Sequence, residues 1–149
     1  MRTFEQLKEI FPDVVPTEWH THPNGNGWVK NTVTIADKIY IGEDAIVSDN
    51  ARIYGNARIS GSAWVYDNAR VYGDARVYGG CWKYSPLYIC GTRFSLSNCK
   101  PGYIQIGCYC LTFDEWLEKG EAIADANNFT AEEKTEYRAY IELFKKIGK

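Results

Sequence analysis

A six-residue pattern of aliphatic and small residues runs through the middle of the chain. From residue 41 onward a β-branched aliphatic residue recurs at every sixth position, and a small residue follows it four positions later. The aliphatic positions are Ile41, Val47, Ile53, Ile59, Val65, Val71 and Val77, and the small positions are Ala45, Ala51, Ala57, Ala63, Ala69, Ala75 and Cys81. The aliphatic series extends back to Val29 and Ile35. A short, fixed period predicts a solenoid, in which equivalent side chains of successive coils stack in columns.

Each hexad predicts one side of a triangular coil, made of a short strand and a tight corner. The aliphatic and small side chains would point inward, while the corners hold Gly, Asn and Asp, which accept a left-handed backbone. Three hexads form an 18-residue coil, so residues 29–82 supply three full coils. Stacked strands lie about 4.8 Å apart, which makes these coils roughly 15 Å of solenoid. We therefore expect a mainly β protein built on a parallel β-helix.

The repeated wording of residues 29–82 resembles the hexapeptide-repeat superfamily, whose pattern is aliphatic, any, Gly, any, small, any. Segments such as IYGNAR and VYGDAR carry the resemblance. It implies a left-handed parallel β-helix, whereas the general rule for parallel crossovers favours the right hand. It also implies a homotrimer with ligands in the grooves between subunits. The phrase ARVYGDARVYG is in addition similar to small hexapeptide-repeat proteins of phages and prophages.

The segment before the repeats predicts a helical cap. Residues 3–11 begin with Thr3 and Gln6, the residue pair of a capping box, and carry one apolar stripe. The ends of a solenoid expose strand edges and core side chains, which a cap protects. We assign residues 1–28 to an N-terminal capping helix and an ordered loop.

After the repeats the hexad wording breaks, but the alternation of apolar and polar residues continues. We expect strands there that extend or close the solenoid, and we assign residues 29–110 to a β-helix of about three to four coils with an irregular last part. Cys81 and Cys99 are 18 residues apart, as are Cys90 and Cys108. That spacing would stack them inside the solenoid, where a free cysteine behaves as a small hydrophobic residue.

Two helices are expected at the end of the chain, in a helical hairpin over residues 111–149. Thr112 and Glu115 form one capping box, and Thr130 and Glu133 form another. An apolar stripe follows each box, so both helices need a surface to cover.

Composition limits the range of functions. The net charge is −2, which does not favour a nucleic-acid partner. No apolar stretch has the length of a membrane span, and the charged, amphipathic N-terminal segment is unlike a secretory signal. Five cysteines are an odd number, which fits a reducing cytoplasm better than a disulfide scaffold. Residues 83–110 hold Lys83, Arg93 and Lys100 and no acidic residue, so this segment alone is basic.

One outer side of the predicted solenoid is apolar. Ile46, Trp64 and Trp82 succeed one another there at the coil spacing. The C-terminal helices or a neighbouring subunit would cover this side, because large exposed apolar patches are unusual in monomers. The alternative function is an aromatic platform for a base or a sugar.

The other two outer sides repeat arginine and tyrosine. They carry Arg52, Tyr54, Arg70 and Tyr72 on one side and Arg58, Arg76 and Tyr78 on the next. In one interpretation this is a solvated face on which the arginines pair with Asp49, Asp67 and Asp74. In the other it is a surface for a partner or a phosphate, because Arg and Tyr are common in binding hot spots and Arg chelates phosphate.

Chemistry-bearing motifs are sparse. Many hexapeptide-repeat proteins are acyltransferases that use coenzyme A and a catalytic His from the coils, but the two histidines here, His20 and His22, precede the coils. His20-Thr-His22 and Cys108-Tyr-Cys110 do not have the spacing of a zinc or redox motif. We therefore expect no catalytic residues, no metal and no cofactor.

These observations favour a non-enzymatic binding protein of the phage accessory type. It would act on a host factor, by blocking a host protein or by sequestering a small nucleotide-like anion, and so counter a host defence. The alternatives are a hexapeptide-repeat acyltransferase and a structural or assembly module. The candidate binding residues are Arg52, Tyr54, Arg58, Arg70, Tyr72, Arg76, Tyr78, Trp64, Trp82, Lys83, Arg93 and Lys100.

Overall fold

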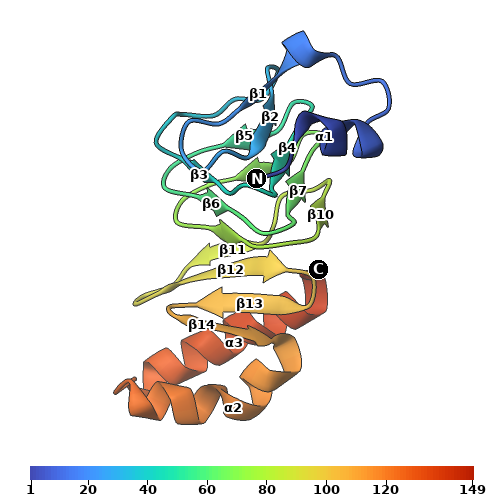
Figure 1. The fold of residues 1–149 in the computed structure, drawn as a ribbon. Helices are drawn as coiled ribbons and strands as arrows, with labels where there is room; N and C mark the ends of the chain where they lie inside the picture. Colours follow the sequence, from blue (N-terminus) through green and yellow to red (C-terminus); the bar gives the residue numbers. More distant parts are fainter. The chain divides into compact units, whose positions relative to one another are not determined.

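The computed structural model describes residues 1–149 and divides into two compact units, Met1–Ser85 and Pro86–Lys149. The first unit contains helix α1 (Phe4–Ile10), the 3-10 turn η1 (Pro16–Glu18) and ten short strands (Figure 1). The second unit contains four strands and two helices. None of the three α-helices has the length and hydrophobicity that crossing a lipid bilayer requires.

The strands of the first unit form a β-solenoid of about three turns. They are β1 (Trp19–Thr21), β2 (Trp28–Lys30), β3 (Tyr40–Ile41), β4 (Ile46–Val47), β5 (Arg52–Ile53), β6 (Arg58–Ile59), β7 (Trp64–Val65), β8 (Arg70–Val71), β9 (Arg76–Val77) and β10 (Cys81–Trp82). Parallel pairing stacks them in the orders β2-β4-β7-β10, β3-β6-β9 and β5-β8, and β1 adds antiparallel to β2. The predicted coil is thus confirmed, and its left hand remains a prediction.

The interior of the solenoid consists of the residues that the hexad pattern selects. The aliphatic positions from Ile41 to Val77 are at most 1 % exposed, and the alanines from Ala45 to Ala75 are at most 2 % exposed. The backward extension holds at Val29, which is buried, but Ile35 is only half-buried. The first coil is therefore less regular than the later ones.

Corners of the solenoid place one residue in the left-handed region at every sixth position. The φ angles are 57° at Asp49, 69° at Gly55, 56° at Gly61, 59° at Asp67 and 63° at Gly73. Glycine and aspartate adopt this conformation at little cost, which explains the corner composition.

The last coil is one residue shorter than the others. Trp64 pairs with Ile46, 18 residues away, but Trp82 pairs with Val65, 17 residues away. The left-handed residue of this corner is Gly80 (φ 82°), seven positions after Gly73, and not Gly79. A one-residue slip exchanges the two faces of a strand, so the predicted orientations of Cys81 and Trp82 are wrong.

Trp82 consequently ends the solenoid from inside. Its side chain is 1 % exposed, and its indole N–H donates to the carbonyl of Gly79 at 2.7 Å. Cys81, which the pattern places inside, is exposed. The large ring fills interior volume that the small residue of a further hexad would leave empty.

The apolar side of the solenoid is covered by the N-terminal segment of the same chain (Figure 1). Leu7 of α1 is fully buried against this side, in a cluster with Ile46 and with Trp19 of β1. Phe11 contacts the ring of Trp64, with ring centroids 5.0 Å apart. The capping box of Thr3 and Gln6 is confirmed. The expectation that the C-terminal helices or another subunit cover this side is wrong here, because α1 and Phe11 already occupy it.

The second unit is a four-stranded antiparallel sheet followed by a helical hairpin. The elements are β11 (Tyr88–Cys90), β12 (Ser95–Lys100), β13 (Tyr103–Ile106), β14 (Tyr109–Thr112), α2 (Phe113–Ala126) and α3 (Ala131–Ile147). Thr112 and Thr130 begin the helices with complete capping boxes, as predicted. Leu96, Ile104, Trp116, Ile141 and Phe144 are buried in the core between sheet and helices.

This antiparallel sheet differs from the expected continuation of the solenoid to residue 110. Gly102 (φ 80°) and Gly107 (φ 57°) turn the chain back on itself between successive strands, which produces hairpins and not coils. The cysteines do not stack at the coil period either. The sulfur of Cys99 lies 3.2 Å from that of Cys110, while Cys90 is exposed.

Candidate binding surface

Two columns of arginine stand on outer sides of the solenoid. Arg52 of β5 is in register with Arg70 of β8, and Arg58 of β6 is in register with Arg76 of β9. All four side chains belong to exposed residues. We call these pairs the arginine columns. Neighbouring strands lie about 4.8 Å apart, and like charges directly opposite each other in a sheet are destabilising.

Carboxylates of the coils do not neutralise three of these arginines. Arg52, Arg58 and Arg70 make no ion pair; the guanidinium of Arg58 lies over the ring of Tyr40, 4.7 Å from its centroid. Asp49 accepts a hydrogen bond from the backbone N–H of Asp67 at 3.1 Å.

The remaining aspartates are engaged as well. The carboxylate of Asp67 lies 3.8 Å from the ammonium of Lys83. Asp74 accepts a hydrogen bond from the Asn56 side chain at 3.3 Å, and it has a further interaction, as has Arg76. The solvated, fully paired face of the first interpretation is therefore not found at Arg52, Arg58 and Arg70.

Tyrosines accompany the columns. Tyr54 is 40 % exposed and Tyr72 is 45 % exposed, and each follows an arginine of the same side by two residues. Tyr78 on the neighbouring side is half-buried. Exposed tyrosine rings beside uncompensated guanidinium groups combine apolar area with positive charge, which is the composition of many binding hot spots.

Several other predicted binding residues lie elsewhere. Trp64 is half-buried beneath α1, and its indole N–H donates to Ser48 at 3.0 Å. Trp82 is inside the solenoid, so neither tryptophan forms an aromatic platform. Lys83 is exposed and paired with Asp67. Lys100, in the second unit, has its ammonium 3.8 Å from the ring centroid of Tyr103.

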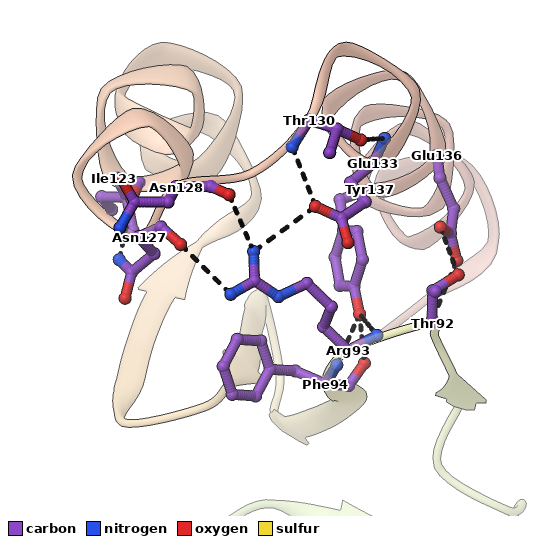
Figure 2. A network of polar contacts seen from close by, with 10 residues as sticks. All are labelled: Thr92, Arg93, Phe94, Ile123, Asn127, Asn128, Thr130, Glu133, Glu136 and Tyr137. Atoms are coloured by element: carbon purple, nitrogen blue, oxygen red, sulfur yellow. Dashed lines mark hydrogen bonds and ion pairs between the residues drawn. The ribbon is translucent and has the colours of Figure 1, made fainter.

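Arg93 is an exposed residue whose side chain makes contacts within the second unit. Its guanidinium donates to the carbonyls of Asn127 and Asn128, both at 3.2 Å, at the C-terminal end of α2 (Figure 2). The same group lies 3.4 Å from Glu133 and 4.4 Å from the ring centroid of Phe129. The carbonyls at a helix C-terminus carry partial negative charge, which a guanidinium compensates.

The turn that carries Arg93 is tied to α3 by two further side chains (Figure 2). The hydroxyl of Tyr137 accepts from the N–H of Phe94 at 2.6 Å and donates to its carbonyl at 2.7 Å. Glu136 accepts from the hydroxyl and N–H of Thr92, and these bonds lower the pKa of Glu136. The sequence around Arg93 did not indicate this structural role, because its partner residues lie more than 30 positions away along the chain.

The two histidines lie in different environments. Nδ1 of the exposed His20 lies 2.8 Å from Oδ1 of Asn31. His22 is 1 % exposed and its Nε2 has no hydrogen-bond partner. No group of three or more His, Cys, Asp or Glu side chains is arranged to hold a metal ion.

Comparison with known families agrees with the stacked coils. A family model described as the YdcK beta solenoid repeat matches residues 51–67, 63–79 and 69–85, which span β5 to β10. Comparison with curated proteins finds no match, and neither does comparison with solved structures. The fold and this similarity together define a repeat β-solenoid protein, and the arginine columns stand on the coils that match.

Proposed function

We propose that this β-solenoid is a non-enzymatic binding protein that uses its arginine columns to bind an anionic partner. The observation that carries the proposal is that Arg52, Arg58 and Arg70 are exposed without a carboxylate partner although Arg52 and Arg70 are in register. Stacked like charges destabilise a sheet, and an anionic partner would remove that cost. Arginine suits this role because its planar fork binds carboxylate or phosphate in a bidentate manner.

The partner that fits best is the acidic surface of another protein. Each column lies on the outward face of a row of strands, where a broad partner can contact arginine and tyrosine together. The resemblance to phage hexapeptide-repeat proteins supports a host protein as this partner, and an accessory role against host defence is part of the proposal. A homotrimer, which the same resemblance implies, would present each column three times around a symmetry axis.

Titration calorimetry with a polyglutamate peptide, at low and at moderate salt, tests this proposal. We expect the double variant Arg52→Ala/Arg70→Ala to bind at least about tenfold more weakly, because a hydrogen bond to a charged group contributes about 1.5–3 kcal/mol. The variant Arg52→Lys/Arg70→Lys should retain part of the affinity. The melting temperature should stay the same, since both residues are exposed.

Arg138→Ala is the matched control, because Arg138 is an exposed arginine of α3 that pairs with Glu142. It should bind the peptide as the unchanged protein does. Equal affinity of the unchanged protein and the double variant would overturn the proposal. Binding of inorganic pyrophosphate but not of polyglutamate would mean that the partner is a small anion and not the acidic surface of a protein. Native mass spectrometry of the same samples measures the oligomeric state and so tests whether the protein is a trimer.

A further inference from the structure

The second unit contains an apolar cavity of about 300 Å³ between its sheet and the helical hairpin. Aromatic rings of Phe94, Tyr109, Trp116 and Phe129 line it, and it opens to solvent. Pockets that bind small molecules begin at about this volume, and an apolar cavity of about half the size is large enough for benzene. The cavity therefore has room for a ligand larger than a single ring.

Small residues of α2 keep the cavity open. Gly120 and Ala124 both line it, on the side opposite the sheet. A Cβ atom at Gly120 would lie 3.7 Å from the ring of Trp116 and 3.8 Å from Ile141, which are ordinary contacts. Glycine is unfavourable inside a helix, and neither backbone conformation nor crowding requires it here. A larger residue would fit the helix better, so the small side chain preserves space.

The mouth of the cavity is held in place. Phe94 and Tyr109 at the mouth are 39 % and 40 % exposed. The ring of Phe94 stacks with that of Phe129, with centroids 6.2 Å apart. The backbone of Phe94 is bound by Tyr137 (Figure 2). The ring of Phe129 lies under the guanidinium of Arg93. A preformed aromatic mouth reduces the ordering cost of binding.

The lining excludes charged ligands. No Lys, Arg, Asp or Glu side chain lines the cavity, and the nearby guanidinium of Arg93 is already occupied by two carbonyls and Glu133. The polar lining includes the amide of Asn127, whose Nδ2 donates to the carbonyl of Ile123 at 2.8 Å. Its Oδ1 makes no hydrogen bond within the chain and is an acceptor for a donor on the ligand.

We propose that this cavity binds a neutral, flat molecule of two fused rings that carries one hydroxyl or N–H donor. The rings fill the space between Phe94, Trp116 and Ile141, and the donor meets Oδ1 of Asn127. This site shares no residue with the arginine columns, so it stands or falls independently of the proposed function.

Titration of the full chain with 2-naphthol tests the site, and 2-naphthoate is the control probe with the same rings and a negative charge. We expect 2-naphthol to bind and 2-naphthoate to bind at least about tenfold more weakly, because the carboxylate would lose its hydration without finding a cation. Gly120→Leu should fill the cavity and abolish binding of 2-naphthol. Ala122→Leu changes an exposed residue of the same helix that does not line the cavity and should bind normally.

Alkylation mapped by mass spectrometry gives a second readout on the unchanged protein. Cys108 is exposed and lines the cavity, whereas Cys81 and Cys90 are exposed elsewhere. We expect 2-naphthol to slow labelling of Cys108 and not of the other two. The proposal is overturned if 2-naphthol fails to bind, if both probes bind alike, or if Gly120→Leu, or Ala124→Leu in its place should it misfold, binds as the unchanged protein does.

Discussion

At the scale of single residues, the corners of the solenoid differ in what they tolerate. Asp49 and Asp67 adopt the left-handed backbone with a side chain in place. At Gly61 a Cβ atom would lie 2.1 Å from the carbonyl oxygen of Tyr78, in the next coil. Gly102 in the second unit is also left-handed, but a Cβ atom there would have nothing within 4 Å. Of these two glycines, Gly61 combines the backbone requirement with a steric one, and Gly102 has the backbone requirement alone.

Gly61→Ala and Gly102→Ala separate these two effects. We expect Gly102→Ala to lower the free energy of unfolding by about 1 kcal/mol, the cost of a left-handed alanine. Gly61→Ala should cost roughly 3 kcal/mol or more, because two coils must also move apart. Urea denaturation measures both. Equal losses would mean that the coils separate without cost at this corner.

At the scale of elements, α1 covers the apolar side of the solenoid and is part of the packed first unit. Its buried Leu7 packs with Ile46 and Trp19, while Ile10 on the same helix is 36 % exposed. Two turns of helix are marginal in water by themselves. The helix is therefore stabilised by the solenoid that it covers.

Leu7→Ala should destabilise the first unit by about 3 kcal/mol, the usual loss for a leucine removed from a packed core. Ile10→Ala, the matched change on the exposed side of α1, should cost less than about 1 kcal/mol. Urea unfolding followed by tryptophan fluorescence reports the difference, because Trp19 and Trp64 lie under the helix. A large loss from Ile10→Ala would contradict the observed orientation of α1.

At the scale of the whole molecule, each unit has a core of its own. The first is built from the inward residues of the coils, and the second from residues such as Leu96 and Phe144 of the sheet and hairpin. Tyr137 belongs only to the second core, where it is 5 % exposed and bound to the backbone of Phe94. The units should therefore respond separately to changes in their cores.

Tyr137→Phe tests that separation. Loss of the hydroxyl leaves the N–H of Phe94 without its acceptor, which costs about 1–3 kcal/mol. Hydrogen exchange followed by mass spectrometry should show faster exchange within residues 86–149 and unchanged exchange within residues 1–85. Faster exchange throughout both ranges would show that the chain opens as one cooperative unit.

The solenoid could be predicted because each hexad contains the aliphatic residue, the corner residue and the small residue that form one side of a coil. The slip at Trp82 could not, because Gly79 and Gly80 are both able to take the left-handed corner. The cover of the apolar side was assigned to the wrong helices, although the stripe of residues 3–11 is the nearest to it along the chain. Beyond Ser85, alternation is the same for parallel and antiparallel strands, but Pro101-Gly102 was a readable hairpin signal.

The candidate site divides in the same way. The register of Arg52 with Arg70 follows from the coil period and was predicted. Asp49 and Asp67 engage partners other than these arginines. This could not be predicted, because the repeat period does not determine where a side chain on the surface points. The role of Arg93 depends on contacts with α2 and α3, and the cavity depends on how their small residues face the sheet. Such long-range packing has no local signal.

The 18-residue coil makes the solenoid a molecular ruler. Duplication or loss of one coil in the gene would change the distance between the two ends of the solenoid by about 4.8 Å and leave both ends intact. When the coil carries arginine, the same event lengthens or shortens each column by one guanidinium. Trp82 marks the end of the regular coils, because its strand is one residue out of the 18-residue spacing. The length of the surface can therefore evolve by whole steps, while point substitutions adjust only its composition.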